Sequence, residues 1–536
     1  MLLFEGTSLK KHIQDRLLFD IDLIQVHEHQ RIGLVGRNGT GKTSLLKIIT
    51  GEELVDGGNV NHFTSVKLVP QFKETRSEKS GGEITQQYLQ LAFNEKPGLL
   101  ILDEPTTHLD TQRIDWLEKK LANYQGAFVV VSHDRTFLNN VCTEIWEIED
   151  GSLNAFKGDY NAYAEQKELI KTQQQIAFEK YEREKKQLEK AIRQKEERAQ
   201  RATKKPKNLS SSEARITGAK THYANIQKKL RGSAKALETR LEQLDRIDKV
   251  KELPEIKMDI LNKESLTNQS VLRAENIKGE VDGRKLWNPF SLYLYGGDKV
   301  AIIGKNGTGK TTLLKKIVER DERIAIPEKV RIGYFSQHLT ILDDDKTIIE
   351  NIQLTSSQDE TLIRTVLARM HFWDEDVYKK VGILSGGEKV KVALAKLFLS
   401  DVNMLVLDEP TNFLDIESLE ALETLMKSYH GTILFVTHDR TLVTNIATKI
   451  IDIKDGKITV FDGSYEAYEE WLENQTKSNN DDQLLLIETK ISDVLGRLSL
   501  EPSRELEDEF QRLLKEKKEL TKNYKNFYCL YEATPS

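Results

Sequence analysis

In the first and last parts of this 536-residue chain, short apolar runs are separated by segments with the pattern of helices. Apolar runs occupy residues 32–35, 99–102 and 128–131 in the first part, and 405–407 and 433–436 in the last part. Continuous apolar runs of this length are typical of parallel strands that are covered on both faces. The pattern predicts an α/β fold in which each part contains a buried parallel sheet.

The middle of the chain, residues 165–265, is polar, charged and mostly free of Gly and Pro. Its apolar residues recur at steps of mostly three and four, which predicts two helices packed as an antiparallel coiled-coil hairpin. This stripe consists of Phe178, Tyr181, Leu188 and Ile192, and then Ile226, Leu230, Leu237, Leu241 and Leu244. Pro206 and the segment 208–212 interrupt the pattern and predict its tip. A similar, shorter pattern around Pro502 predicts a C-terminal helical hairpin.

The two ends of the chain repeat each other. Residues 36–43 return almost unchanged as 304–311, at an offset of 268, and Gln71 returns as Gln337 at an offset of 266. The motifs from Ser80 onward repeat at an offset of 305. The large change in offset falls at one place, where the second copy has a segment at 339–384 with a predicted helix at 360–371, and the first copy has only residues 72–79. The predicted domains are a first repeat with a shortened helical subdomain at 1–164, a coiled-coil linker at 165–265, a second repeat at 266–475 and a helical extension at 476–536.

Composition limits the class of protein. The formal net charge is −6, and the two cysteines, Cys142 and Cys529, predict a reducing compartment without a disulfide framework. The first residues lack the basic and apolar regions of a signal peptide, and no apolar run reaches the roughly 18–20 residues that span a bilayer. We therefore expect a soluble, cytoplasmic protein.

The repeated glycine-rich segment has the residues that bind a nucleotide. Both copies match G-x-x-x-x-G-K-[ST], a loop whose backbone N–H groups surround phosphates at the start of a helix. The predicted nucleotide-binding residues are Gly36, Arg37, Asn38, Gly39, Thr40, Gly41, Lys42, Thr43 and Ser44, and in the second copy Gly304, Lys305, Asn306, Gly307, Thr308, Gly309, Lys310, Thr311 and Thr312.

Each copy also has candidate metal ligands and catalytic groups downstream of the loop. The predicted Mg²⁺ ligands, all with side-chain oxygens, are Thr43, Gln71 and Asp103, and Thr311, Gln337 and Asp408. The predicted catalytic residues are two glutamates that polarise the attacking water and two histidines that contact the γ-phosphate: Glu104 and His133, and Glu409 and His438. Alone, such residues are usually solvated strand ends or loop positions. Two copies in one order at one spacing reduce chance to below roughly one in a hundred.

Further motifs resemble those of ATP-binding cassette proteins. Two segments resemble the signature motif of these proteins: Ser80, Gly81, Gly82 and Glu83, and Ser385, Gly386, Gly387 and Glu388. Residues 103–106 and 408–411 resemble the Walker B motif, and His133 and His438 resemble the switch histidine. The resemblance implies that the signature of each cassette closes the phosphate loop of the other. ATP with Mg²⁺ would then join the cassettes, and hydrolysis would release them.

Two cassettes on one chain with a charged helical hairpin between them resemble the ABC-F family of translation factors and ribosome-protection proteins. The shortened first cassette, the long hairpin and the C-terminal extension are most similar to the Vga-type antibiotic-resistance members. That resemblance implies a monomer whose ATP-bound cassettes close on each other and bind the ribosome. It also implies that the hairpin tip lies near the peptidyl-transferase region, with rRNA and tRNA as partners, and protects against lincosamides, pleuromutilins and streptogramin A.

Three residues depart from the pattern of that family. Lys79 stands where a Leu usually opens the signature, and Thr107 and Phe413 interrupt the usual Glu-Pro-Thr-Asn-His-Leu-Asp. Together with the shortened first cassette, these departures predict two ATP sites that are competent but unequal. No clear aromatic residue for stacking on adenine precedes either loop.

The far end of the linker is strongly basic. Between residues 195 and 231, eleven Lys and Arg stand against three Glu, a net charge of +8 in a chain of −6. A charged helix face is commonly only solvated, but clustered Lys and Arg gain by releasing counterions when they bind phosphates. No base-reading motif is present, which favours shaped RNA over a DNA sequence. The candidate RNA contacts are Lys204, Lys205, Lys207, Arg215, Lys220, His222 and Tyr223.

Other functions stay open at this point. A housekeeping ABC-F factor that acts on stalled ribosomes would have the same motifs. The ATPase subunit of a membrane drug exporter would need a separate membrane partner. DNA-repair ATPases usually have longer coils or zinc-binding cysteines, which two isolated cysteines cannot supply. A non-enzymatic, ATP-gated binding module is disfavoured by the intact Glu104 and Glu409.

Overall fold

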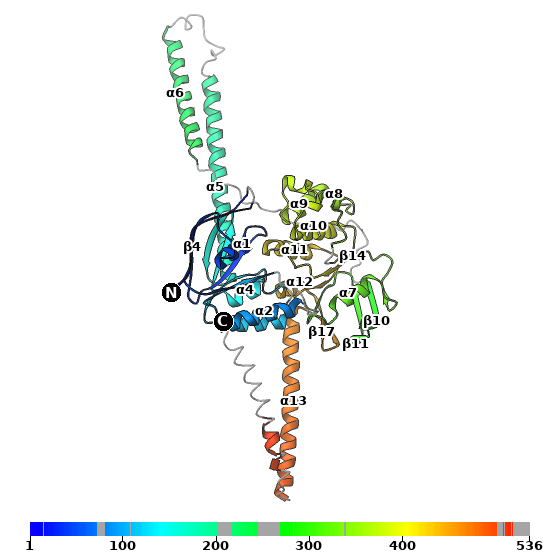
Figure 1. Ribbon diagram of the computed structural model, residues 1–536. Helices are drawn as coiled ribbons and strands as arrows, with labels where there is room; N and C mark the ends of the chain where they lie inside the picture. Colours follow the sequence, from blue (N-terminus) through cyan, green and yellow to red (C-terminus); the bar gives the residue numbers. More distant parts are fainter. Residues whose placement is uncertain are drawn as a thin grey trace. The chain divides into compact units, whose positions relative to one another are not determined.

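A computed structural model describes most of the chain, and its ribbon is shown in Figure 1. The described residues are 1–13, 16–71, 81–107, 109–201, 217–244, 269–281, 283–336, 339–500, 507–508, 510–515 and 517. By packing, the chain divides into two compact units. The first comprises Met1–His108, Arg113–Ile256 and Arg364–His371, and the second comprises Leu109–Gln112, Lys257–Ile363 and Phe372–Ser536. The predicted domain boundaries stay predictions.

A six-stranded sheet forms the centre of the first unit, with the order β5-β6-β7-β3-β8-β9. The first five of these strands pair in parallel and β9 is antiparallel. All residues of β6 and β7 are buried, which confirms the strands predicted from the apolar runs. The strands are β3 (Arg31–Gly36), β5 (Val66–Val69), β6 (Leu99–Asp103), β7 (Ala127–Val131), β8 (Glu144–Glu149) and β9 (Ser152–Lys157).

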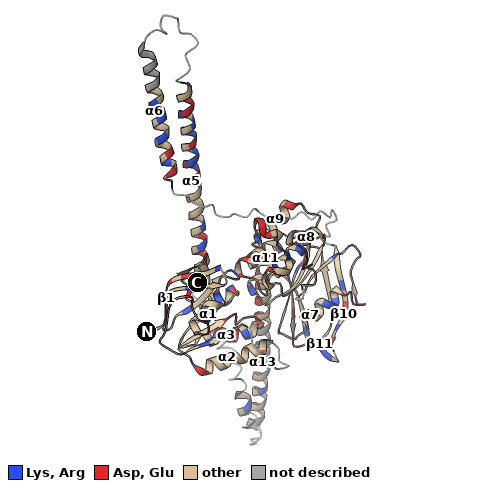
Figure 2. Cartoon of the chain, turned by 45° about the horizontal axis from the view of Figure 1, so that its top comes forward, with Lys and Arg blue, Asp and Glu red and all other residues tan. Residues whose placement is uncertain are grey.

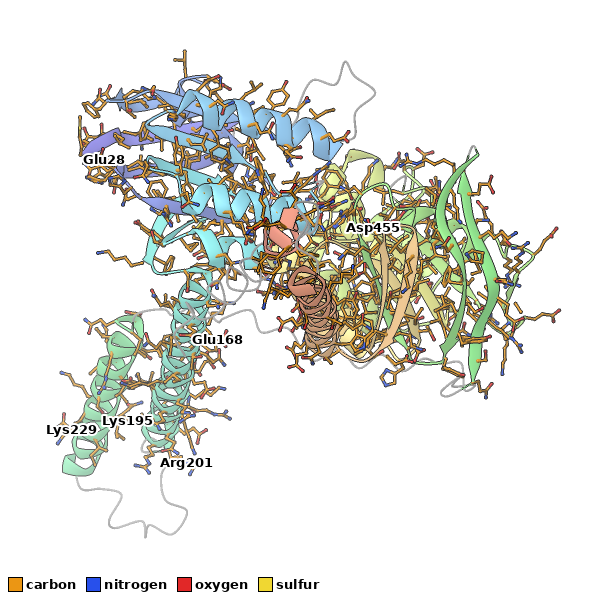
Figure 3. The ribbon with its side chains drawn as sticks, turned by 90° about the horizontal axis from the view of Figure 1, so that it is seen from below. Glu28, Glu168, Lys195, Arg201, Lys229 and Asp455 are labelled. Carbon is orange, nitrogen blue, oxygen red and sulfur yellow. The ribbon has the colours of Figure 1, made fainter. Side chains whose placement is uncertain are left out.

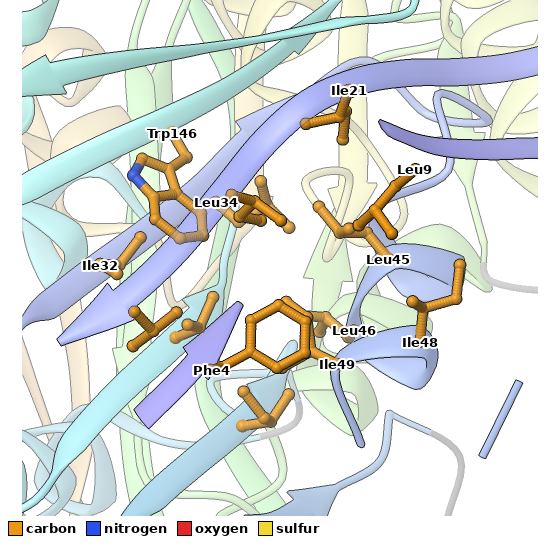
Figure 4. Close-up of a cluster of buried hydrophobic side chains, with 14 of the residues drawn as sticks. Phe4, Leu9, Ile21, Ile32, Leu34, Leu45, Leu46, Ile48, Ile49 and Trp146 are labelled. Atoms are coloured by element: carbon orange, nitrogen blue, oxygen red, sulfur yellow. The ribbon is translucent and has the colours of Figure 1, made fainter. Parts of the chain in front are cut away.

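A second, antiparallel sheet in this unit has the order β2-β1-β4, formed by β1 (Leu2–Ile13), β2 (Arg16–His27) and β4 (Gly57–His62). The helices are α1 (Lys42–Thr50), α2 (Gly81–Glu95), α3 (Thr111–Ala122) and α4 (Arg135–Val141). Figure 4 shows that α1 packs into the core of both sheets, because its apolar side chains share one cluster with Phe4 of β1 and Leu34 of β3. Each buried side chain of this size stabilises the fold by about 1.5–3 kcal/mol. The start of α1 is therefore held firmly at the end of β3.

The linker forms the predicted helical hairpin from α5 (Tyr160–Arg201) and α6 (Thr217–Glu242), in which α6 lies beside the outer part of the longer α5 (Figure 1). Leu188, Ala199 and Ala234 are buried between the helices. Arg240 of α6 also donates to Glu184 of α5, at 3.0 Å. Of the predicted stripe, Leu188 is buried and Ile226 is exposed, whereas the two buried alanines were not part of it. The predicted tip, including Pro206 and 208–212, lies outside the described residues.

The second unit repeats the same sheet topology, β14-β15-β16-β12-β17-β18 beside β11-β10-β13. The strands are β10 (Ser270–Val281), β11 (Arg284–Tyr295), β12 (Lys299–Gly304), β13 (Ile324–Ala325), β14 (Ile332–Phe335), β15 (Met404–Asp408), β16 (Thr432–Val436), β17 (Lys449–Lys454) and β18 (Lys457–Asp462). The helices along this part of the chain are α7 (Lys310–Val318), α8 (Ile348–Gln353), α9 (Glu360–Arg369), η2 (Asp374–Tyr378), η3 (Val381–Ile383), α10 (Gly386–Leu399), α11 (Ile416–Ser428) and α12 (Arg440–Ile446). By packing, Arg364–His371, which includes most of α9, belongs to the first unit. The predicted helix at 360–371 is present as α9, in the segment that the first copy lacks.

A long helix, α13 (Tyr465–Leu500), follows the last strand and begins the predicted C-terminal extension. Tyr468 fixes its first turns, because its hydroxyl donates to Asp452 of β17 at 2.7 Å and its ring stacks on Trp471. The described residues between 507 and 517 are helical as well, in agreement with a second arm. Within the described part of the chain, no helix has both the length and the apolar character needed to cross a membrane.

Candidate nucleotide-binding sites

Both glycine loops turn from a central strand into a helix over an aromatic side chain. Gly41 precedes α1 with φ of 96°, and Gly309 precedes α7 with φ of 97°, a left-handed conformation that favours glycine. A Cβ atom at Gly41 would lie 3.0 Å from the ring of Phe19, and one at Gly309 would lie 2.3 Å from the ring of Trp287. The tight turn thus depends on glycine at both positions, and an aromatic ring supports each loop from below.

A lysine side chain spans each loop. The Lys42 Nζ donates to the carbonyl oxygens of Gly36 at 2.7 Å and Arg37 at 2.9 Å. Lys310 makes the same pair of hydrogen bonds in the second copy, at 2.8 and 3.1 Å. Both lysines are buried, and burial lowers the pKa of Lys310 while the carboxylate of Glu409 opposes that change. Each loop therefore surrounds an ammonium group, which suits an anion such as a phosphate.

The predicted metal ligands from the helix and the neighbouring strand meet in both copies. The Thr43 hydroxyl donates to Asp103 at 3.1 Å, and the Thr311 hydroxyl donates to Asp408 at 3.1 Å. Burial raises the pKa of Asp408, and the hydrogen bond from Thr311 opposes the rise. Paired hydroxyl and carboxylate oxygens fit Mg²⁺, which takes its other ligands from phosphates and water. The described residues contain no cluster of three or more His, Cys, Asp or Glu that could hold a metal ion.

The other two predicted metal ligands are the glutamines. Gln71 follows β5, at the same sheet edge as the ends of β3 and β6, because these strands run in parallel. Gln337 lies outside the described residues. The carboxyl ends of parallel strands are where ligands bind in open α/β sheets, and the role of Gln71 as a metal ligand stays a prediction.

Both predicted catalytic glutamates have the same unusual backbone. Glu104 has φ of 48° and Glu409 has φ of 51°, in the left-handed region that costs a non-glycine residue about 1–3 kcal/mol. Each backbone N–H donates to the last residue of the next strand, at 3.0 Å to Val131 and 3.0 Å to Val436. Strain at the same residue in both copies indicates that the position of this side chain is functional.

The surroundings of the two carboxylates differ. Glu104 Oε1 lies 3.2 Å from His133 Nε2 and its side chain is 8% exposed. Burial raises the pKa of Glu104 to about 8, and the carboxylate of Asp103 adds to the rise while Lys42 opposes it. Glu409 is more open, with 18% of its side chain exposed, and its Oε1 lies 3.8 Å from His438. Its Oε2 instead accepts a hydrogen bond from Asn412 Nδ2 at 2.6 Å.

The second histidine is oriented toward its own phosphate loop. His438 Nε2 lies 3.0 Å from Asn306 Oδ1 and 3.3 Å from Lys310 Nζ. The second copy therefore brings the loop, the strand-ending carboxylate and the histidine together as predicted. In the first copy, His133 is in contact with Glu104. All four predicted catalytic residues thus lie at the carboxyl edge of their sheet.

Similarity to known proteins identifies the family of this chain. A family model described as ABC transporter matches residues 20–78 and 287–412. The chain is 30% identical over 543 residues to ABC transporter F family member 2 of Arabidopsis thaliana, covering 83% of this chain and 75% of that protein. It is 32% identical over 468 residues to the erythromycin resistance ATP-binding protein MsrA of Staphylococcus epidermidis, covering 82% and 96%. The chain belongs to the ABC-F family.

Solved structures show the same fold for this ABC-F protein. The archaeal ribosome recycling factor aABCE1 superposes with a TM-score of 0.58 at 17% identity, covering 87% of this chain and 92% of that chain. A structure titled RNase-L Inhibitor gives a TM-score of 0.57 at the same identity. This likeness confirms the predicted fold class of two α/β cassettes. As an ABC-F protein, the chain is an ATPase that binds a nucleotide.

The signature motif of the second cassette begins a helix in this ABC-F protein. Ser385 precedes the 14-residue α10, and its hydroxyl accepts a hydrogen bond from the backbone of Glu388, whose carboxylate accepts one from the Ser385 N–H at 2.8 Å. This capping box leaves Ser385 and Gly386 exposed at the positive end of a helix, which suits a phosphate. In the first cassette, Gly81, Gly82 and Glu83 begin α2, and Ser80 lies outside the described residues.

The candidate RNA contacts lie at the edge of the described structure. Lys204, Lys205, Lys207 and Arg215 are outside the described residues, and Lys220, His222 and Tyr223 lie on α6 without described side chains. Sequence reasoning also missed two features of the cassettes. One is the contact of Asn412 with Glu409, and the other is the aromatic support of the loops. The aromatic support could have been found from Gly279. This residue pairs across the sheet with Trp287, and a Cβ atom on it would lie 2.2 Å from the Trp287 ring.

Proposed function

We propose that this ABC-F protein binds the ribosome while ATP joins its two cassettes. In that state the α5–α6 hairpin contacts rRNA and tRNA near the peptidyl-transferase region and protects translation from antibiotics of the lincosamide, pleuromutilin and streptogramin A type. ATP hydrolysis then releases the protein as a monomer. The observation that carries the proposal is a hairpin with a basic outer half, joined directly to an ATPase cassette.

The described part of the hairpin supports contact with a phosphate backbone. Figure 2 shows Lys and Arg on both helices, and Figure 3 shows the side chains of Lys195 and Arg201 on α5 and of Lys229 on α6. On α6 a shallow hollow of about 370 Å³ is lined by Gln227, Lys228, Arg231, Gly232 and Lys235. Gly232 leaves open space there, and the three cations around it suit contact with a phosphate backbone.

Relatives and neighbours support the ribosomal assignment. MsrA is named an erythromycin resistance protein. The neighbouring structures include a ribosome recycling factor and a ribosome-bound complex of archaeal Pelota and ABCE1. Erythromycin therefore belongs in the antibiotic panel that tests the proposal, beside the three classes implied by the resemblance.

The geometry supports one division of roles in each cassette. Lys42 and Lys310 would bind the β- and γ-phosphates, and the Thr–Asp pairs with the glutamines would hold Mg²⁺, which neutralises phosphate charge when bound. Glu104 and Glu409 would accept a proton from the attacking water. We further propose that Ser385, Gly386 and Gly387 close the first loop, and that Ser80, Gly81 and Gly82 close the second.

The test is a protein that binds ATP and does not hydrolyse it. The double variant Glu104→Gln/Glu409→Gln should co-sediment with ribosomes in ATP and stay in the supernatant without nucleotide. The variant Lys42→Ala/Lys310→Ala is the control, because it lacks both loop cations and should not sediment in either condition. If the glutamine variant stays in the supernatant in ATP, the proposal is wrong.

The hairpin can be tested separately in the trapped protein. Replacing Lys228, Arg231 and Lys235 by Gln should weaken ribosome binding. It should also reduce the slope of the log binding constant against log salt concentration, by about 0.7–0.9 for each lost phosphate contact. The matched control replaces Lys180, Arg183 and Lys186 of α5 by Gln. The last two already pair with Glu179 and Glu182 on the same helix. Equal loss in both variants contradicts a specific role for α6.

Growth of a sensitive host that expresses the chain identifies the biological role. Protection against one antibiotic class names the resistance. Ribosome binding without any protection favours a housekeeping factor for stalled ribosomes. ATPase stimulation by membranes and not by ribosomes favours the exporter.

A further inference from the structure

The two cassettes differ at the third residue after the catalytic glutamate. That residue is Thr107 in the first cassette and Asn412 in the second. The backbone turn is the same, since the N–H of each residue donates to the carbonyl of its glutamate at 3.3 Å. The two glutamates therefore have the same local backbone, and the side chain three residues later differs.

In the second cassette the amide holds the carboxylate. Asn412 Nδ2 donates to Glu409 Oε2 at 2.6 Å, a short hydrogen bond to a charged acceptor. One oxygen is thereby fixed, and Oε1 is left on the side of His438, at 3.8 Å. A general base must present one oxygen to the water in a defined direction, and a second hydrogen bond on the same carboxylate supplies that direction.

In the first cassette the same position cannot supply this contact in the same way. The hydroxyl of Thr107 is attached to Cβ, one bond closer to the backbone than an asparagine amide nitrogen. The Glu104 carboxylate lies instead against His133, at 3.2 Å, and is less exposed than its counterpart. The oxygen that would face the attacking water is thus in contact with another side chain.

The rest of the two sites agrees closely. The Thr–Asp pairs are both 3.1 Å apart, and the lysine contacts to the loops differ by at most 0.2 Å. Nucleotide binding should therefore be similar in both cassettes. Among the described residues, the differences lie around the glutamate and the histidine, since His133 contacts Glu104 whereas His438 contacts its own phosphate loop.

We infer that Asn412 is a positioning residue for Glu409, and that Thr107 at the equivalent place makes the first cassette the slower of the two hydrolytic sites. The inference rests on the ATPase activity of the family and not on ribosome binding. It predicts a change in kcat without a matching change in KM or nucleotide affinity, because the residue acts on the glutamate and not on the phosphates.

The test uses the full chain with single exchanges between the cassettes. Asn412→Thr should lower steady-state kcat about tenfold and leave KM and the affinity for a fluorescent ATP analogue within twofold. Asn412→Asp has the same shape but replaces the donor by a second carboxylate that repels Glu409, so it should lower kcat at least as much. Thr107→Asn should raise the turnover of the first site severalfold, measured in the Glu409→Gln background.

The outcomes separate positioning from a structural role. Unchanged kcat in both Asn412→Thr and Asn412→Asp overturns the inference. So does a parallel loss of kcat, nucleotide affinity and thermal stability in Asn412→Thr that Asn412→Asp restores, because shape rather than the hydrogen bond would then matter. If Asn412→Thr does not fold, the Thr107→Asn variant decides, and no gain in its first-site turnover overturns the inference.

Discussion

The first and second cassettes have matching phosphate loops and different surroundings for the glutamate. In both, a lysine spans the loop and a threonine reaches the strand-ending aspartate at 3.1 Å. Around the glutamate the partners are His133 in one cassette and Asn412 in the other. The comparison indicates that backbone geometry fixes where a nucleotide binds, whereas a few side chains set how fast it is hydrolysed. Binding and hydrolysis can therefore diverge between two copies of one site.

The largest expected effect comes from removing each catalytic carboxylate alone. Glu409→Gln should lower steady-state ATPase activity about tenfold or more, since it removes the base of the faster site and leaves only the slower one. Glu104→Gln should lower it less than about fivefold, because the slower site adds little to the total. Steady-state phosphate release measures both. Equal losses would show that the two sites contribute equally and break the comparison.

The metal ligands should behave alike, since their geometry is the same in both cassettes. Thr43→Ala and Thr311→Ala should each weaken Mg²⁺-dependent nucleotide binding about tenfold, the loss of one hydroxyl ligand. A fluorescent ATP analogue titrated with and without Mg²⁺ gives the two affinities. A large loss in one variant and none in the other would place the asymmetry in nucleotide binding instead of hydrolysis.

The smallest expected effect concerns the aromatic support of the loops. Gly279→Ala should destabilise the second unit by about 1–3 kcal/mol, because its Cβ would lie 2.2 Å from the Trp287 ring. Adding Trp287→Phe should recover part of this loss by making room. In the first cassette the matching pair is Lys11 and Phe19, so Lys11→Ala is the control. It creates no clash and should cost about 1–2 kcal/mol, because the largely buried Lys11 loses its contacts with Glu53 and Asp56. Urea denaturation checks all three.

The sequence predicted the buried parallel strands and the loops, because both follow from spacing, but it gave no sign of the antiparallel sheets β2-β1-β4 and β11-β10-β13. The apolar runs at 99–102 and 405–407 became the buried strands β6 and β15, and the glycine loops follow β3 and β12. A helix predicted at 360–371 is α9. Motif order and the length of apolar runs determine backbone topology, and both can be counted in the sequence.

The contacts around the glutamates could not be predicted in the same way. Glu104 and Glu409 occupy identical motifs, and their different partners depend on burial and on the neighbouring side chain. The start of the hairpin shows a similar limit. The helix α5 begins at Tyr160, before the composition changes near residue 165, because Tyr163 donates to Glu147 of β8 at 2.7 Å and joins the helix to the sheet. Tertiary contacts of this kind leave little trace in composition.

The central claim is that one residue beside the glutamate decides which cassette hydrolyses ATP faster. The most direct measurement exchanges that residue in both cassettes, as Thr107→Asn/Asn412→Thr, and then adds Glu104→Gln or Glu409→Gln. In the exchanged protein, Glu104→Gln should become the variant that loses most steady-state ATPase activity. If Glu409→Gln still causes the larger loss, the asymmetry arises elsewhere in the cassettes, and the claim is wrong.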